Sequence, residues 1–314
     1  MKRIIVLLLS ALMVLSVLSG CDNKKNNNDN KLKVVTTIFP IYDWVREVLG
    51  DVDADVEVLL NNGVDLHSYQ PTVDDIAKIN NADVFMYVGG ESDGWVESVL
   101  ESNKNVRVVN LLEVLGDSVK LEEELEGVEH DYEHDHEDEE EYDEHVWLSL
   151  RNAKKCVEAI KDVLCELDSS NADRYEKNAE EYIEKLELLD QKYMEVVSNS
   201  KNNTLIFGDR FPFRYLVDDY NLNYYAAFVG CSSESEASFN TITFLANKLD
   251  ELGLTSILTI EGNNHKIAET IIKNTENKNQ EILTLNSMQG GILEGDTYLS
   301  IMEANLEVLK KALN

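Results

Sequence analysis

The amino-acid sequence predicts an α/β protein with two βα lobes, each built on a parallel sheet and joined by a long rigid helix. Three observations support this class. Short β-branched runs alternate with helix-spaced segments in the first half of the chain, the alternation resumes in the second half, and a long helical stripe separates them. Because α/β folds bind ligands beyond the carboxyl ends of their strands, we expect a site in the cleft between the lobes.

The start of the chain predicts an export signal. A short basic stretch precedes an apolar run over residues 4–17, which is too short to span a bilayer as a stable helix. The run ends in Leu18-Ser19-Gly20-Cys21, which matches the bacterial lipobox. We therefore expect residues 1–20 to be a lipoprotein signal peptide and Cys21 to carry the lipid. The alternative is an ordinary signal peptide with an incidental cysteine.

Residues 21–31 are rich in Asn and Lys and offer almost no apolar side chain to bury, so they predict a flexible tether. A lipid-bearing cysteine with several acyl chains holds firmly to a membrane. The expected location is therefore extracytoplasmic, anchored to the cell membrane as a lipoprotein.

The first lobe is predicted over residues 32–169. β-branched and apolar runs alternate in it with helix-spaced segments, and Pro40 and Pro71 fit helix starts. The expected strands are residues 33–39, 56–60, 84–88 and 106–109, and the expected helices begin at Pro40, Pro71 and Trp95.

A linking helix is predicted over residues 170–200. Helical periodicity covers 150–167 and again 172–198, and capping residues at 168–171 separate the two stretches. The second stretch is long for a globular helix. It is either a rigid strut between the lobes or a plain crossover helix.

The second lobe is predicted over residues 201–314, where the alternation resumes. The expected strands are 204–207, 224–228, 256–260 and 281–285, and the expected helices are 213–220, 239–252, 265–274 and 298–313.

The formal net charge of -32 limits the partners of this chain. Nucleic acid is excluded, because its binders need basic patches to meet phosphate. Electrostatic docking onto anionic lipid is disfavoured for the same reason. The charge suits attraction of cations, although most of these carboxylates are an ordinary solvated surface. Four scattered cysteines do not make a disulfide scaffold.

Two of the six histidines lie where a ligand site is expected. His67 follows the second predicted strand, just before a helix, and His145 lies at the edge of the central helix. A lone histidine is more often a packing or surface residue than a ligand, so neither decides the matter alone.

A second group of histidines lies in a His-rich, acidic loop at about residues 122–144. His130, His134 and His136 alternate there with Asp and Glu. Neutral imidazole is a good ligand for zinc, copper and nickel, and carboxylates add charge. The segment lacks an apolar face, so we expect a mobile loop that recruits metal weakly. Without cysteines or fixed spacing it is not a closed structural zinc site.

The sequence resembles the zinc and manganese substrate-binding proteins of ABC importers over nearly all of the chain after Cys21. The resemblance depends on residues 34–43, the His67 segment, residues 144–148, residues 213–216, and residues 295–299 with Met302 and Asn305. It implies two βα lobes joined by one long rigid helix. An acidic, His-rich loop before the second ligand histidine is typical of the zinc-specific members.

The resemblance also implies a ligand set, which this chain matches only in part. His67 and His145 match the two ligands of the first lobe. The third position falls at Arg210, which cannot coordinate a cation, so its neighbour Asp209 is the substitute candidate. The fourth falls at Asn286.

Further candidates in the second lobe follow predicted strands. Cys231 is an alternative ligand, since a thiolate favours zinc. Glu261 is another, although Glu234 and Glu261 are also possible ion-pair partners of Arg210.

The predicted function is capture of a transition metal ion, with Zn²⁺ favoured, and delivery to the permease and ATPase subunits of an ABC importer. Mn²⁺ or another divalent metal is the first alternative. A zinc-dependent hydrolase is the second, but it needs an open coordination position and a general base, and the chain has no His-Glu-x-x-His motif and no nucleophile elbow. We therefore predict no enzyme activity. A role in cell adhesion is a weaker possibility, because some relatives have been linked to it.

Overall fold

The structure, a computed structural model, describes residues 31–60, 64–101, 105–123, 125–128, 141–230, 236–262, 264–289 and 295–314. Residues Leu32–Asn314 form one compact unit. The predicted signal peptide with Cys21, and the histidines His130, His134 and His136, lie outside the described residues. Within the described ranges, no helix has the length and apolar character needed to cross a membrane.

The first lobe is a four-stranded parallel sheet with strand order β2-β1-β3-β4. Pro40 lies in the first turn of α2, and Thr72 and Asp75 form a capping box that starts α3. The elements are β1 (Leu32–Thr36), α2 (Phe39–Leu49), β2 (Ala54–Val58), α3 (Val73–Asn80), β3 (Val84–Tyr87), α4 (Trp95–Glu101), β4 (Arg107–Asn110) and the short α5 (Leu111–Leu115).

The second lobe repeats the same topology, with strand order β6-β5-β7-β8 and all pairs parallel. Its β7 is buried at every position, as expected for a strand covered on both faces. The elements are β5 (Thr204–Phe211), α8 (Arg214–Asp219), β6 (Asn223–Val229), α9 (Phe239–Glu251), β7 (Ser256–Ile260), α10 (Lys266–Asn274), β8 (Glu281–Leu285) and α11 (Tyr298–Ala312).

β5 is longer than its apolar run. It continues through Gly208, Asp209 and Arg210, and the register against β6 shifts between Phe207 and Arg210. The shift is a bulge, which re-aims the side chains that follow it. This strand carries two of the residues that the sequence singles out.

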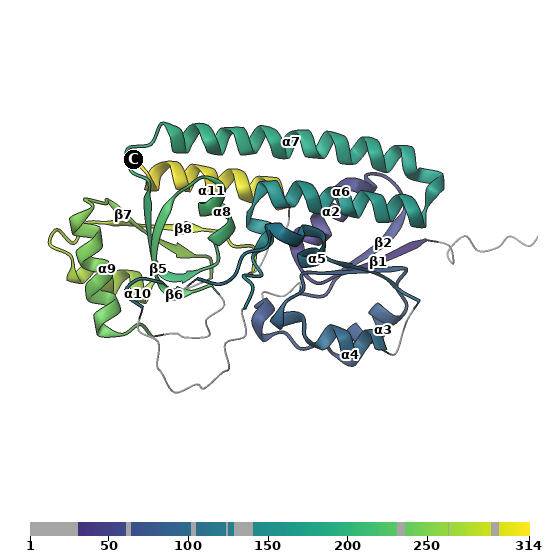
Figure 1. Cartoon of the computed structure of the whole chain (residues 1–314), viewed down its shortest axis with the longest axis horizontal. Helices are drawn as coiled ribbons and strands as arrows, with labels where there is room; N and C mark the ends of the chain where they lie inside the picture. The colour runs from purple at the N-terminus through teal and green to yellow at the C-terminus, as the bar shows by residue number, and fades with distance from the viewer. Residues whose placement is uncertain are drawn as a thin grey trace, which may run out of the picture. The chain divides into compact units, whose positions relative to one another are not determined.

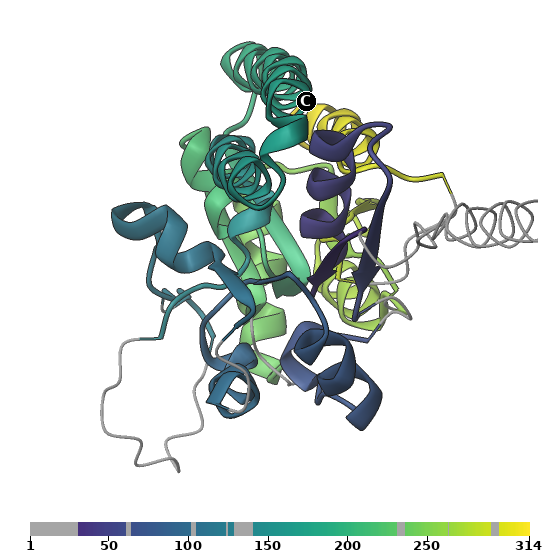
Figure 2. The same ribbon diagram turned by 90° about the vertical axis from the view of Figure 1, so that its right-hand side faces the viewer.

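Two long helices connect the lobes: α6 (Leu150–Leu167) and the 27-residue α7 (Ala172–Ser198). α7 packs on α6 and α2 of the first lobe and on α11 of the second, and it runs above both sheets in Figure 1. Figure 2 shows α6 and α7 nearly end on. Asn178 donates to the main-chain oxygen of Val48 at 3.0 Å, and Tyr193 donates to that of Met302 at 2.6 Å. The predicted parallel-sheet lobes and long helix are confirmed, and α7 is anchored in both lobes as a strut requires.

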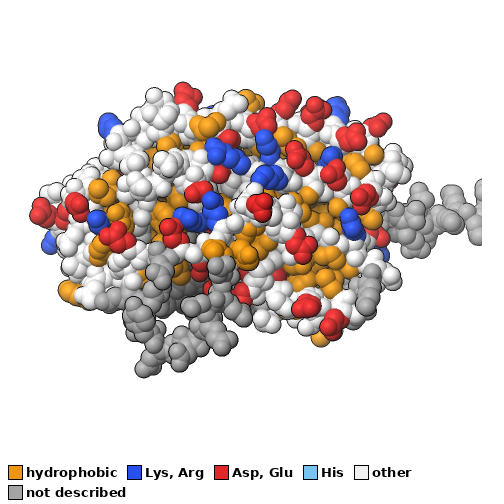
Figure 3. All heavy atoms as spheres, viewed as in Figure 1, with side chains coloured by type: hydrophobic (Ala, Val, Ile, Leu, Met, Phe, Trp, Pro, Cys, Tyr) orange, Lys and Arg blue, Asp and Glu red, His pale blue; other side chains and the backbone are white. Residues whose placement is uncertain are grey.

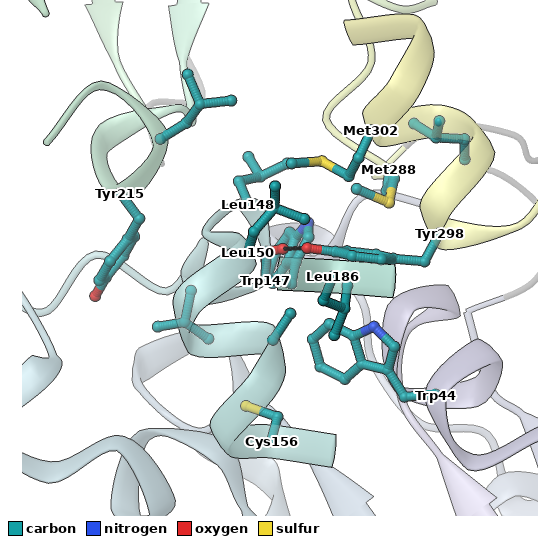
Figure 4. Packing of buried hydrophobic residues seen from close by; sticks show 14 of the residues in the cluster. Trp44, Trp147, Leu148, Leu150, Cys156, Leu186, Tyr215, Met288, Tyr298 and Met302 are labelled. Atoms are coloured by element: carbon teal, nitrogen blue, oxygen red, sulfur yellow. Dashed lines mark hydrogen bonds between the residues drawn. The ribbon is translucent and has the colours of Figure 1, made fainter. Parts of the chain in front are cut away.

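The hydrophobic core is continuous across the lobes, as Figure 4 shows. Tyr298, the first residue of α11, contacts the Trp44 ring edge-on with 5.1 Å between ring centroids. Its hydroxyl donates to the main-chain oxygen of Trp147 at 2.7 Å, and the indole N–H of Trp147 donates to that of Ser287 at 2.9 Å. Residues of both lobes therefore meet in a buried layer next to His145.

Charge is spread over the surface rather than collected at one point. On the face shown in Figure 3, Asp and Glu side chains are scattered over both lobes among Lys and Arg. This distribution agrees with the expectation that most carboxylates of this acidic chain are solvated surface groups.

Candidate metal centre

His67 lies at the carboxyl end of the first sheet, in the short helical turn Leu66–Ser68 that follows β2. The Asp65 side chain caps this turn by accepting from the His67 N–H at 3.1 Å. The Nδ1 atom of His67 lies 2.8 Å from the Ser92 hydroxyl, in the turn Glu91–Asp93 that follows β3. Its other ring nitrogen, Nε2, is thereby turned toward His145.

His145 precedes the turn Val146–Leu148 and has no solvent-exposed surface. Its main-chain N–H and its Nδ1 both contact the same oxygen of Asp143, at 2.8 and 3.0 Å. An ionised carboxylate only accepts hydrogen bonds, so the proton of this contact lies on Nδ1 of His145, and Nε2 is the ring nitrogen left to bind a metal ion. A carboxylate behind an imidazole is the arrangement that orients metal-binding histidines.

The two imidazoles converge through their Nε2 atoms, which lie 3.2 Å apart. Two nitrogens bound to one tetrahedral Zn²⁺, each at about 2.0–2.1 Å, are separated by roughly 3.3–3.4 Å. The imidazole donors, the hydrogen bond by which Asp143 orients His145, and the distance between the two Nε2 atoms all fit a cation shared by the two histidines. Within the described ranges, no third His, Cys, Asp or Glu joins them in a group that could hold a metal ion.

Buried carboxylates surround the back of this pair. Glu144 accepts from the Ser92 N–H at 2.8 Å, and its other oxygen lies 3.6 Å from Nδ1 of His67. Burial raises the pKa of Glu144 and raises that of Asp93 to about 7. Burial therefore disfavours the charged form of both acids, and Glu144 lies on the Nδ1 side of His67.

Protonation does not compete with metal binding at His67 near neutral pH. Burial and the neighbouring His145 lower the pKa of His67 to about 4. The imidazole is therefore neutral at pH 7, which is the form that binds metal.

Asp209 and Arg210 occupy the bulge of β5. The Asp209 carboxylate accepts from the Ile260 N–H at 3.1 Å and from the Arg210 N–H at 2.9 Å. Arg210 forms an ion pair with Asp65 of the first lobe at 2.8 Å. Both oxygens of Asp209 thus have main-chain donors, and its role as a ligand stays a prediction. The structure pairs Arg210 with Asp65, while Glu234, one of the two partners expected from the sequence, lies outside the described residues.

Glu261 and Asn286 lie together at the carboxyl ends of β7 and β8. Glu261 accepts from the Ser287 N–H at 2.7 Å, from the Ser287 hydroxyl at 2.8 Å and from the Gln289 N–H at 3.1 Å. The amide oxygen of Asn286 accepts from the Met288 N–H at 2.8 Å. These contacts hold the loop after β8, and ligation by either residue stays a prediction.

Cys231 and Glu234 lie outside the described residues, but Gly230 is described and lies against His145. A Cβ atom placed on Gly230 would be 3.2 Å from Cε1 of His145 and 2.8 Å from the main-chain oxygen of Phe211. Only a glycine fits this approach of the second lobe to the histidine ring.

An apolar cavity of about 180 Å³ lies beside the pair, between the lobes. Its walls include Leu66 and Trp147, the neighbours of the two histidines, together with Met288 and Gln289 of the second lobe. The cavity lies between the lobes, beyond the carboxyl ends of the parallel strands, where α/β folds bind ligands.

Sequence reasoning missed the residues that orient the histidines. Asp143 lies two positions before His145, and this Asp-x-His spacing is a local signal that a reader could have used. Asp65 lies two positions before His67 with the same spacing, whereas Ser92 carries no such signal because it reaches His67 from another βα turn.

Comparisons with known proteins place the whole folded unit in one group. The family model "ZnuA: Zinc-uptake complex component A periplasmic" matches residues 34–312. The zinc-binding lipoprotein AdcA of Streptococcus pneumoniae is 34% identical over 314 residues, which are 99% of this chain and 61% of that relative. This chain therefore spans less than two thirds of the length of AdcA.

Two further comparisons cover nearly the full length of both chains. The high-affinity zinc uptake system protein ZnuA of Bacillus subtilis is 32% identical over 312 residues, 97% of this chain and 96% of that protein. The Zn(II)-bound ZnuA-like domain of S. pneumoniae AdcA matches with a TM-score of 0.70 and 31% identity, covering 90% of this chain and 99% of that domain.

Proposed function

Because the chain belongs to the ZnuA family of zinc-uptake components, we propose that it captures Zn²⁺ outside the cytoplasm and delivers it to an ABC importer. One observation carries the proposal: the Nε2 atoms of His67 and His145 converge at 3.2 Å in the cleft between the lobes. Zinc favours imidazole ligands, whereas oxygen-rich sites suit manganese, so the pair supports Zn²⁺ over Mn²⁺.

The remaining ligands belong to the proposal. Among the sequence candidates of the second lobe, Cys231 follows directly on Gly230, which packs against His145. Asp209, Glu261 and Asn286 are the other candidates, and their side-chain oxygens already accept main-chain hydrogen bonds. Thiolate sulfur and imidazole nitrogen are both common zinc ligands.

The proposal includes partners and a location, which membership in a family of zinc-uptake components supports. The loaded protein would meet the permease and ATPase subunits of an importer, while a lipid on Cys21 would hold it at the membrane outside the cytoplasm. Family membership and zinc-uptake relatives leave the zinc-dependent hydrolase without support.

The decisive experiment is metal analysis of purified residues 32–314 beside a His67→Ala/His145→Ala double variant. We expect one tightly bound zinc ion in the parent and none in the double variant, measured by elemental analysis after dialysis against a weak chelator. Circular dichroism of both proteins checks that the variant is folded. A folded double variant that keeps its zinc would show that the two histidines are not the site.

A further inference from the structure

Within the described residues, an ion pair joins the second lobe to the short helical turn that carries His67. The contacts that lead to it start at Asp209 in the bulge of β5. This side chain is buried and holds the bulge from two directions, by accepting from the Ile260 N–H of β7 and from the Arg210 N–H. These two hydrogen bonds hold the backbone of the bulge in place, and they therefore fix the position from which the Arg210 side chain extends.

Arg210 crosses from the second lobe to the first. Its Nη1 lies 2.8 Å from Oδ2 of Asp65, and the two side chains are only 23% and 27% exposed. Partial burial strengthens such a pair relative to one on the open surface. Although burial acts to raise the pKa of Asp65, the Arg210 guanidinium keeps it below its ordinary value.

The second carboxylate oxygen of Asp65 contacts the first residue of the histidine pair, His67. Oδ1 accepts from the His67 N–H and caps the turn Leu66–Ser68 that carries this histidine. Asp65 therefore joins Arg210 on one side to His67 on the other. The contacts run without a gap from β7 through Asp209, Arg210 and Asp65 to His67.

We propose that Arg210 is a positioning residue, which fixes the His67 turn through Asp65 so that His67 Nε2 faces His145 before the metal arrives. Arg210 does not bind the ion. The second lobe thereby contributes to affinity through an ion pair as well as through any ligand that it supplies. A site that is already arranged loses less conformational entropy on binding. This inference rests on the proposed function, because it assumes that His67 holds zinc.

The test compares zinc affinity in residues 32–314 and in the variants Arg210→Gln, Asp65→Asn and their combination. Asn keeps an oxygen that can accept from the His67 N–H, so Asp65→Asn removes mainly the ion pair. We expect each single variant to raise the zinc Kd about tenfold or more, as loss of supporting contacts commonly does. The double variant should be no weaker than the weaker single variant, because both changes break one connection. Arg210→Lys should recover part of the loss.

A matched control separates this role from general stabilisation. Lys120 and Asp218 also form an ion pair between the lobes, with 2.5 Å between Nζ and Oδ2. The main-chain oxygen of Lys120 accepts from the Asp143 N–H, but within the described residues the paired side chains contact neither histidine, so Lys120→Gln leaves the main-chain contact in place. Lys120→Gln should lower the melting temperature about as much as Arg210→Gln while leaving the zinc Kd unchanged. Competition against a fluorescent zinc chelator gives the Kd, and calorimetry gives the melting temperature.

The outcomes identify which idea fails. An unchanged or smaller zinc Kd in Arg210→Gln would overturn the positioning role, and a smaller one would mean that the guanidinium acts mainly by repelling the cation. Equal losses of zinc affinity in Arg210→Gln and Lys120→Gln would mean that any ion pair between the lobes supports zinc binding, and that the contact with Asp65 has no special role. His67→Ala, measured in parallel, tests the premise: if it keeps full affinity, the proposed site itself is wrong.

Discussion

At the residue scale, Asp43 shows how burial makes a single carboxyl group sensitive to pH. It lies on α2, is only 8% exposed, and accepts from the N–H of Tyr298, the first residue of α11, at 2.9 Å. The acid therefore caps a helix of the other lobe. Burial nevertheless dominates and raises the pKa of Asp43 to about 6.

The raised pKa has a definite sign for stability. The folded protein holds the Asp43 proton more tightly than the unfolded chain does. The contribution of Asp43 to the free energy of unfolding therefore falls as pH rises from about 4 to about 6, and it stays level above that. Asp43→Asn keeps an acceptor for the Tyr298 N–H and removes the charge. We expect metal-free Asp43→Asn to be more stable than the parent by roughly 1–3 kcal/mol at pH 8 and equally stable at pH 4. Urea denaturation at both pH values measures this, and a loss of stability at pH 8 would contradict it.

The ligand residues show what a sequence can and cannot reveal at this scale. His67 and His145 were identified by their places after a strand and before a helix, and the structure brings them together. The partner Ser92 and the pairing of Asp65 with Arg210 were not identified, because these contacts join segments that are distant in sequence. An ion pair between the lobes depends on how the two sheets are oriented relative to each other, and local residue patterns do not reveal that orientation.

At the element scale, α7 was predicted over the range in which it forms, and so were α6, β7 and β8. Long periodic stripes and continuous apolar runs carry strong signals. The five-residue α5 was missed because it is too short to show a period. β5 was cut short because Gly208 and Asp209 disfavour strands, whereas the bulge accommodates them.

Two tyrosines of α7 offer a matched test of what anchors this helix. Tyr193 and Tyr182 are both almost fully buried, but only the Tyr193 hydroxyl has a hydrogen-bond partner within the described ranges, the main-chain oxygen of Met302. We expect Tyr193→Phe to lower the free energy of unfolding by about 1 kcal/mol, since it deletes a hydrogen bond to α11. Tyr182→Phe should leave it unchanged or raise it slightly, because it removes a buried polar atom without a partner. Chemical denaturation measures the free energy of unfolding of both variants. A larger loss in Tyr182→Phe than in Tyr193→Phe would contradict this account of how α7 is anchored.

At the scale of the whole molecule, the acidic loop and the histidine pair are proposed to divide the task of capture. The net charge of -32 raises the local concentration of cations, and the loop histidines add weak ligands. The buried pair then supplies the tight site.

Deleting residues 130–137 tests this division. The deletion removes His130, His134 and His136 and leaves His67 and His145 in place. We expect slower zinc association, by severalfold at low ionic strength, with the equilibrium Kd of the tight site almost unchanged. Stopped-flow mixing with zinc measures the rate, and replacement of the segment by Gly and Ser of equal length controls for loop length. If the deletion abolishes tight binding, the loop belongs to the site itself.

The contacts of Tyr298 bear on the order in which the chain assembles during synthesis. The histidine pair and its partners Asp143 and Ser92 lie within the first half of the chain, in a lobe of locally connected strands and helices. The buried layer next to His145, by contrast, needs α11, whose residues are synthesised after those of every other described helix. A growing chain can thus form its histidine turns early, but the layer beside them is completed only after α11 has been made.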